Sequence, residues 1–479
     1  MLGEIIAEAA RRFGDRTAIA APGGVSLSYR ELHTISDEVA AGLQRRGIGE
    51  GDVVALVMPP VPEYIVFYLA AAKVGAVTAG VNDKLAPPER SRLLEVAQPS
   101  LVVSAVESLV ELRVTGGVPQ RPRSKPSSPV AIIFTSGTTG APKGALFCNS
   151  QLSAITGIDV GPAWGGGGRM LLGTAMAHLG PMTKLPGNLK KGATMLVTRS
   201  WHAREALELT AEHRLTAVSG IPTQVALMMR DPSFETFDLS SVRSVVIGGG
   251  PAPPALVREA RRRFQAPVMV RYSCTEAGIG LGTRPGDPDE DAEVSVGRPQ
   301  EGVQVTVRDA DGEVLAAGEI GEVCLASAAV MSGYWRDAEA TRQVMTADGA
   351  VKTGDLGWID DRGRLRLSGR KKEMYVRGGY NVFPAEVESV LADHPSVASV
   401  AVVPTSDPVM GEVGVAVVVL HAGTDRVALD ELRRFAAPRL AAYKLPSAVL
   451  VVDELPLTAM HKLDRVRLAD LVERALAGR

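Results

Sequence analysis

The stretch AIIFTSGTTGAPKGA, residues 131–145, decides the fold, because an apolar strand runs directly into a loop of glycines and hydroxyl residues. Glycines let a backbone approach an anion closely, hydroxyls donate hydrogen bonds to phosphoryl oxygens, and a lysine adds a point charge. The sequence lacks the order G-x-x-x-x-G-K-[ST] of the common phosphate loop. We therefore predict a polyphosphate site here, with a plain polar turn as the alternative. The candidate residues are Thr135, Ser136, Gly137, Thr138, Thr139, Gly140 and Lys143.

Apolar runs and helical patterns alternate on both sides of this loop. Residues 27–48 have apolar side chains at helical spacing, and the apolar run VVALVMP follows them. Strands that alternate with helices predict a parallel sheet covered on both faces. We expect the six runs that follow residue 129 to form a second parallel-rich layer; these are AIIF, MLLG, ATMLV, TAVSG, SVVIGGG and PVMVRY. Residues 114–129 are rich in Pro, Gly, Ser and Arg and predict a surface loop.

The pattern changes near residue 297. Shorter alternating runs joined by Asp-Gly and Arg-Gly turns predict antiparallel hairpins. After Gly369 a compact unit follows, in which PAEVESVLADH and ALDELRRFAAPRLAAY predict helices and VASVAVVPTSD and VGVAVVVL predict strands. The fold class is thus α/β, with a large domain over residues 1–369 of stacked α/β subdomains plus an antiparallel β portion. A small α+β domain is expected over residues 370–479.

Composition excludes several functions. The 52 Lys and Arg residues nearly balance 54 Asp and Glu, for a formal net charge of -2, so nucleic acid and anionic membranes are not expected as main partners. Three cysteines without CxxC spacing argue against a disulfide framework and a structural zinc site. The N-terminal residues lack the apolar core of a signal peptide, and no apolar run approaches the roughly 20 residues that cross a bilayer. We expect a soluble, cytoplasmic enzyme.

Motifs in order along nearly the whole chain resemble those of the adenylate-forming superfamily, which contains acyl-CoA synthetases, firefly luciferase and nonribosomal peptide synthetase adenylation domains. They are LSYREL, TSGTTGAPKG, GGGPAP, YSCTE, TGDL, GRKKEMYVRGGYNVFPAEVE and LPLTAMHKLDR. The penultimate of these looks most like medium- or long-chain acyl-CoA synthetases. The resemblance implies ATP, Mg²⁺ and CoA as cofactors. It also implies that a carboxylate attacks the α-phosphate of ATP, giving an acyl-adenylate and pyrophosphate, before a thiol displaces AMP.

The resemblance assigns roles to particular residues. Glu276 would hold Mg²⁺ and Thr275 an α-phosphate oxygen, since a hard cation prefers a carboxylate. Tyr272 would contact adenine, with a core tyrosine as the alternative. Asp355, expected in a tight turn, would accept the ribose hydroxyls, and Arg370 would donate to the ribose or a phosphate. Four further residues of the matching motifs are assigned to nucleotide binding: Gly249, Gly250, Pro251 and Ser273.

Lys462 is the candidate catalytic cation, because an anion that attacks another anion needs a positive group between them. The family motif PKTxxGK is altered here by Leu457 and His461. In the family, the C-terminal domain rotates about a residue that corresponds to Lys372 and brings in a loop that carries the glycines 378 and 379. Gly378 and Gly379 would then line the pantetheine channel, although a hairpin turn explains them almost as well.

His178 lies where the family commonly has a residue that gates the acyl pocket, although a lone histidine is more often structural. The segment HLGPMTKLPG lacks the aspartate that would pair with the ammonium of an amino acid, which argues against amino-acid substrates. Residues 220–222 and 278–280 are small or aliphatic, so we expect an apolar acyl group.

Three functions remain open from the sequence. The preferred one is an AMP-forming acyl-CoA synthetase, an acid–thiol ligase of fatty acid metabolism. A second is a free-standing ligase that loads an acyl group onto a phosphopantetheinyl carrier protein. A third is a regulator that binds a nucleotide or acyl-CoA without catalysis. The sequence indicates neither the oligomeric state nor the acyl chain length.

Overall fold

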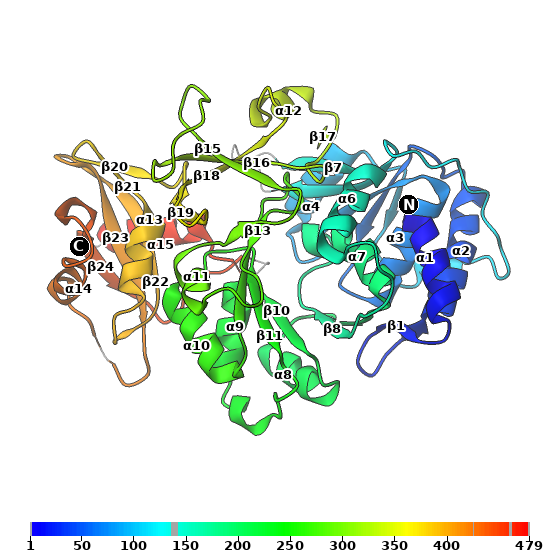
Figure 1. The fold of residues 1–479 in the computed structure, drawn as a ribbon, viewed down its shortest axis with the longest axis horizontal. Coiled ribbons are helices and arrows are strands. Elements are labelled where there is room, and N and C mark those ends of the chain that lie inside the picture. Colours follow the sequence, from blue (N-terminus) through cyan, green and yellow to red (C-terminus); the bar gives the residue numbers. More distant parts are fainter. Residues whose placement is uncertain (1, 136–141, 425, 459–461, 478–479) are drawn as a thin grey trace.

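The computed structural model describes residues 2–135, 142–424, 426–458 and 462–477. Within these residues the strands form five sheets (Figure 1), and the C-terminal unit lies at the opposite end of the molecule from the N-terminal helices. Among the described helices, none combines the length and the apolar character needed to cross a membrane.

A six-stranded sheet carries the predicted polyphosphate loop. The inner strands pair in parallel, whereas the strand after the loop runs antiparallel to the strand before it. In sheet order the strands are β17 (Gly333–Tyr334), β7 (Lys143–Cys148), β6 (Pro129–Thr135), β4 (Val77–Val81), β3 (Val53–Val57) and β5 (Leu101–Val103). The helices α3 (Pro62–Val74), α4 (Pro87–Ala97) and α6 (Asn149–Val160) pack against it.

Two further sheets complete the α/β portion. The first holds β2 (Ser26–Ser28), β1 (Thr17–Ala20), β9 (Thr194–Val197) and β8 (Arg169–Leu172), with helices α1 (Leu2–Phe13), α2 (Tyr29–Arg45) and α7 (Leu179–Lys191) nearby. The second holds β10 (Ala217–Gly220), β11 (Ser244–Gly248), β12 (Val268–Tyr272), β13 (Leu281–Gly282) and β14 (Arg298–Pro299). Its helices are α8 (Ala203–Glu212), α9 (Pro222–Arg230), α10 (Pro254–Phe264) and α11 (Asp289–Val294).

The predicted second parallel-rich layer is wrong in its grouping. The six apolar runs are strands, but β6 joins the first sheet, β8 and β9 the next, and β10 to β12 a third. Strand pairing is a long-range property that local apolar patterns do not encode. Residues 113–128, all described, form neither helix nor strand, as predicted for the segment that follows α5 (Ser108–Leu112).

The antiparallel portion matches the prediction. It holds β15 (Gln304–Arg308), β16 (Gly321–Ala326), β18 (Val351–Ile359) and β19 (Leu365–Arg370), with α12 (Ala338–Val344) before β18. Gly363 has φ +70° in the turn that joins β18 to β19. The tight turn predicted at Asp355 is wrong, because Asp355 lies within β18 and pairs across the sheet with Arg370. The residue before it, Gly354, has a left-handed φ of +72°, whereas Asp355 does not have a positive φ.

The C-terminal unit follows β19. It contains the strands β20 (Tyr375–Arg377), β21 (Tyr380–Val382), β22 (Val397–Asp407), β23 (Gly411–Leu420) and β24 (Ala448–Val451) and the helices α13 (Pro384–Leu391), α14 (Leu429–Ala436) and α15 (Arg465–Ala477). The helix predicted over residues 428–443 is too long. It ends at Ala436, because Pro438 has no N–H to donate and disfavours helical backbone in the residue before it.

Two contacts join this unit to the third α/β sheet. Arg258 Nη2 lies 3.0 Å from Asp393 Oδ1, and Arg230 Nη2 donates to the carbonyl oxygen of Ala398 at 2.6 Å. The C-terminal unit thus rests against α9 and α10, as Figure 1 shows.

Candidate active site

The ends of β6 and β7 place the base of the predicted polyphosphate loop. Thr135 ends β6 and Lys143 begins β7. The Lys143 ammonium lies 5.2 Å from the centroid of the Tyr334 ring. Ser136, Gly137, Thr138, Thr139 and Gly140 lie outside the described residues.

Asp355, Arg370 and Tyr272 form one cluster. Arg370 Nε lies 2.7 Å from Asp355 Oδ1, and the Tyr272 hydroxyl donates to Asp355 Oδ2 at 2.7 Å. Burial raises the pKa of Asp355, and the charge of Arg370 and the bond from Tyr272 offset this only in part. Burial, and then the negative charge of Asp355, raise the pKa of Tyr272, so the phenol remains a donor. The sequence prediction treated these residues as separate ligand contacts and missed their direct bonds.

Thr275 and Glu276 lie in the turn that follows β12. The Tyr334 hydroxyl donates to Glu276 Oε1 at 2.6 Å. In the described part of the chain no group of three or more His, Cys, Asp or Glu side chains could hold a metal ion.

The loops after β11 and β12 lie at the same edge of their sheet, because these neighbouring strands are parallel. Gly249, Gly250 and Pro251 follow β11, and Gly249 has φ +76°. Ser273 follows β12, and its hydroxyl donates to the carbonyl oxygen of Cys274 at 3.1 Å. The structure therefore brings the GGGPAP and YSCTE motifs together, at the type of edge where open α/β sheets bind ligands.

His178, Arg370 and Lys462 come from distant segments of the chain and are near enough for their charges to influence one another. Burial, and then the positive charge of Lys462, lower the pKa of His178 to about 4. Loss of solvation at the Lys462 ammonium, and then the positive charge of Arg370, lower the pKa of Lys462. Part of this side chain is nevertheless exposed. Within the described residues, no carboxylate forms an ion pair with Lys462. Arg370 is paired with Asp355 and His178 is neutral, so Lys462 is the charged group here that can attract an anion.

The described residues on the two sides of positions 459–461 pair with each other. Leu457 and Leu463 form an isolated antiparallel bridge, and Thr458 N donates to the carbonyl oxygen of Lys462 at 2.7 Å. His461 lies outside the described residues.

The sequence reasoning missed Asn82, which lies just after β4. Its Nδ2 is 3.4 Å from His178 Nε2, and its Oδ1 accepts a hydrogen bond from Lys84 N at 3.0 Å. An amide nitrogen can only donate, so Nε2 accepts and the proton of the neutral ring resides on Nδ1. The sequence held no signal for this, because 96 residues separate the two side chains.

The glycines near the expected acyl pocket serve different purposes. A Cβ on Gly278 would lie 2.4 Å from Ala329 O, and one on Gly280 would lie 2.3 Å from Tyr272 O. Both glycines therefore permit close backbone packing. Gly180, two residues after His178, is different, since a Cβ there would meet no atom within 4 Å.

Lys372 lies in a turn directly after β19, at the start of the C-terminal unit. Gly378 and Gly379 form the turn between β20 and β21, with φ +56° and +86°. This geometry matches the hairpin alternative, and the channel role stays a prediction.

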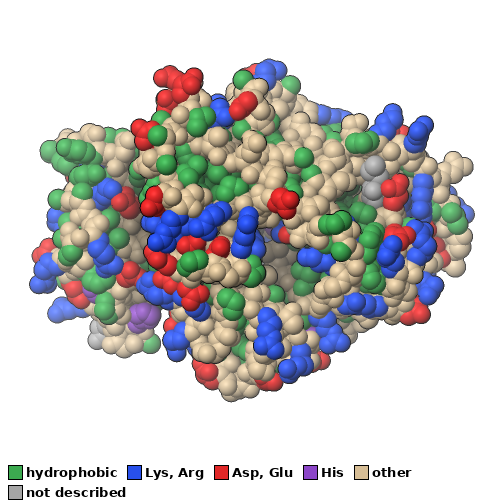
Figure 2. Space-filling view, in the orientation of Figure 1, with side chains coloured by type: hydrophobic (Ala, Val, Ile, Leu, Met, Phe, Trp, Pro, Cys, Tyr) green, Lys and Arg blue, Asp and Glu red, His purple; other side chains and the backbone are tan. Residues whose placement is uncertain are grey.

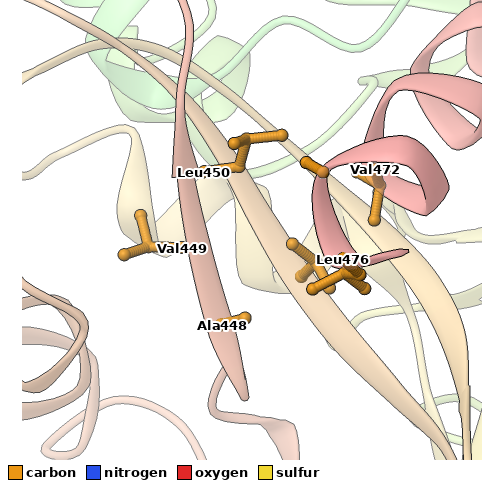
Figure 3. Close-up of a pocket in the computed structure, with 7 residues that line it drawn as sticks. Ala448, Val449, Leu450, Val472 and Leu476 are labelled. Atoms are coloured by element: carbon orange, nitrogen blue, oxygen red, sulfur yellow. The ribbon is translucent and has the colours of Figure 1, made fainter. Parts of the chain in front are cut away.

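The surface is hollowed near the centre of the face in Figure 2, where β13 and α7 approach each other in Figure 1. A separate pocket lies between β24 and α15 (Figure 3). Every side chain that lines this second pocket is apolar: Val415, Ala448, Val449, Leu450, Val472, Ala475 and Leu476. It is a packing gap with no polar side chain to hold a nucleotide.

Comparisons with known proteins agree with this geometry. The AMP-binding enzyme family matches residues 6–335, and the AMP-binding enzyme C-terminal domain matches residues 386–462. The chain therefore belongs to the adenylate-forming superfamily, within its AMP-forming acid–thiol ligases.

Relatives cover nearly its whole length. It is 33% identical to indoleacetate–CoA ligase of Aromatoleum aromaticum, over 96% of each chain. It is 31% identical to the fatty acid–[acyl-carrier-protein] ligase ScoC of Streptomyces coeruleorubidus, over 93% of this chain and 92% of the relative. The structure of the amide bond synthetase McbA from Marinactinospora thermotolerans superposes with a TM-score of 0.88 at 30% identity, over 98% of this chain and 99% of McbA.

Proposed function

We propose that the protein is an ATP-dependent acyl-CoA synthetase that activates an apolar carboxylic acid. The observation that supports this most is the position of Lys462, whose charge acts on His178 and which is within range of the charge of Arg370, although the three residues come from distant segments. The proposal includes a nucleotide- and acyl-binding domain over residues 1–369 and a mobile domain over residues 370–479. A reducing, cytoplasmic location is part of it, since the three cysteines are free thiols.

In the adenylation step, Lys462 lies between the substrate carboxylate and the α-phosphate and offsets their repulsion. An ammonium about 4 Å from an anion gains on the order of 4 kcal/mol of gross Coulomb energy at an effective dielectric of 20. Asp355 and Arg370 hold the ribose, with Tyr272 fixing Asp355 beside the adenine. Thr275 donates to the α-phosphate, and Glu276 would hold Mg²⁺, which supplies charge neutralisation on the phosphates.

In the thioester step, the C-terminal domain rotates about Lys372 and withdraws Lys462. This rotation breaks the contacts of Arg258 with Asp393 and of Arg230 with Ala398. Gly378 and Gly379 then line the path of the pantetheine arm, where the absence of side chains leaves room for a thin ligand.

An apolar acid is supported by the relatives, and an acyl pocket that includes His178 is part of the proposal. Indoleacetate–CoA ligase and ScoC are named for an aromatic and a fatty acid, which share an apolar body. His178, neutral because its pKa is about 4, would border the carboxylate end of this pocket.

The alternative acceptor is the phosphopantetheine of a carrier protein, since ScoC is named for such an acceptor. Acid-dependent pyrophosphate release should be measured over fatty, aryl and dicarboxylic acids, each with CoA, with a phosphopantetheinyl carrier protein, and with neither. The proposal predicts release with an apolar acid and thioester formation with CoA. Thioester only on the carrier protein would favour the alternative, and no release with any acid would favour a regulator without catalysis.

A further inference from the structure

Tyr334 lies between two groups that the proposed mechanism uses. It belongs to the short strand β17, where it pairs with Ala145 of β7, the strand that begins at Lys143. Tyr334 is 8% exposed. Tyr334 lies outside the motifs that carry the family resemblance.

Both ends of this side chain contact the nucleotide machinery. The hydroxyl donates to Glu276 Oε1 at 2.6 Å, and the ring lies beneath the Lys143 ammonium, which is 5.2 Å from the ring centroid. The backbone is also fixed, because Tyr334 N donates to Thr341 Oγ1 at 2.8 Å. Gly333 has φ +140°, and a Cβ there would lie 3.0 Å from Thr341. Tyr334 is therefore held at its backbone, its ring and its hydroxyl.

The chemistry of these contacts is directional. The Tyr334 hydroxyl is the donor and the Glu276 carboxylate the acceptor, because an ionised carboxylate has no hydrogen to donate. A carboxylate bonded at one oxygen is fixed in orientation, and its other oxygen stays available to a cation. The negative face of the ring attracts the ammonium of Lys143.

We propose that Tyr334 is a positioning residue that sets the Glu276 carboxylate and the Lys143 ammonium at the distance and orientation that a magnesium–nucleotide complex requires. The proposal rests on the proposed roles of Glu276 and Lys143. It adds a residue that acts through both of them and contacts neither substrate nor nucleotide itself.

Binding of ATP to the full chain, measured by calorimetry without any acid substrate, tests this. Titrations are run with excess EDTA and at a series of Mg²⁺ concentrations. Tyr334→Phe keeps the ring and removes the hydroxyl, so we expect a loss of roughly 10- to 100-fold in affinity for ATP with Mg²⁺, the scale typical of second-layer partners of a metal ligand. Its affinity for ATP in EDTA should stay near that of the wild type. Tyr334→Leu should also weaken binding in EDTA, because Lys143 then loses the ring.

The matched control is Tyr29→Phe. Tyr29 is fully buried, and its hydroxyl donates to Ala193 O at 2.7 Å in another part of the fold. This variant should lose stability and keep both ATP affinities. If Tyr334→Phe does not fold, Thr341→Val, which loosens the backbone of Tyr334, should give a smaller loss confined to the Mg²⁺ titration.

Two outcomes would overturn the proposal. In the first outcome, the affinity of the wild type for ATP depends on Mg²⁺, but Tyr334→Phe has the same ATP affinities as Tyr29→Phe, or loses ATP affinity equally with and without Mg²⁺. The positioning role is then wrong and the proposed function stands. If wild-type affinity does not depend on Mg²⁺, the proposed role of Glu276 fails and that of Tyr334 fails with it.

Discussion

Two lysines of this protein, one in the N-terminal core and one in the candidate active site, have lowered pKa values in opposite surroundings. Lys73 is 2% exposed, and its ammonium lies 2.8 Å from Asp37 Oδ1 and donates to Ser36 Oγ at 2.7 Å. Burial lowers the pKa of Lys73 to about 8, with the charge of Asp37 opposing this. Lys462 instead lies near a second cation, Arg370. A lysine with every donor bonded stabilises a fold, whereas one without an anion is ready to bind one.

Carboxylates show the same contrast. Asp291 is fully buried and accepts hydrogen bonds from Arg298 at 2.8 Å and Arg364 at 2.5 Å. Burial alone would raise the pKa of Asp291, but these two bonds lower it. The pKa of Asp355 in the site is raised, even with Arg370 beside it. The ion pairs of Asp291 thus favour its charged form, whereas the surroundings of Asp355 favour the charged form less. This fits a carboxylate that changes partners during catalysis.

The largest expected effect lies at the structural lysine. Lys73→Met removes the buried donor to Asp37, to Ser36 Oγ and to the carbonyl oxygen of His33, although Arg121 still pairs with Asp37 at 2.8 Å. We therefore expect the free energy of unfolding to fall by about 3 to 5 kcal/mol, the usual result of breaking a buried pair. Urea unfolding measures this, with Lys462→Met as the matched control that should leave stability unchanged. If both substitutions lowered the free energy of unfolding by the same amount, the two lysines would not differ in their contribution to stability, and this prediction would be wrong.

A smaller effect is expected from His33, whose Nδ1 lies 3.1 Å from Lys73 Nζ. Burial, and then the charge of Lys73, lower the pKa of His33 to about 4. As the pH falls, His33 is protonated at a higher pH in the unfolded chain than in the folded chain. The contribution of His33 to stability is therefore full above pH 6.5 and is lost as the pH falls towards 4. The loss is at most about 3 kcal/mol, from roughly 1.4 kcal/mol per pKa unit.

His33→Gln should remove this part of the acid destabilisation. Urea midpoints compared at pH 7 and pH 4.5 for the wild type and the variant check it, with the exposed His202→Gln as control. A variant whose stability falls with pH as steeply as that of the wild type would show that His33 titrates normally.

The smallest effect is expected at the hinge. Lys372→Pro restricts the backbone where the C-terminal unit begins, so thioester formation should slow by roughly tenfold to a hundredfold, the cost of a misplacement of about 1 Å. Adenylate formation should change little, because the arrangement described here already brings Lys462 to the site. Rapid-quench assays of each half-reaction measure both rates, and Lys372→Ala controls for the lost side chain. Parallel losses in both rates would argue against a hinge.

Local sequence patterns predicted most helices and strands. They did not predict which strands pair, because pairing joins residues that lie far apart in the chain. The runs around β6, β8 and β10 were strong enough to predict strands, but their division among three sheets depends on how the connecting helices pack. The end of α14 was missed although Pro438 was visible in the sequence, because the apolar spacing continues past it.

The site was predictable as a set of motifs and not as a set of contacts. Resemblance gave Asp355, Arg370 and Lys462, and the structure brings them to one region. The bond from Tyr334 to Glu276 spans 58 residues, and that between Asn82 and His178 spans 96. Such pairs leave no periodicity or spacing in a single sequence, so only the folded chain shows them.

The most direct test of the account separates the two half-reactions in Lys462→Ala. We predict that adenylation falls by roughly 10² to 10³, as for the loss of one preorganised donor, while a presynthesised acyl-adenylate is still converted to thioester at close to the wild-type rate. Lys444→Ala, which removes a lysine paired with Glu386 in the same unit, serves as control. Equal loss in both half-reactions of Lys462→Ala would contradict the assignment of this lysine to the first step.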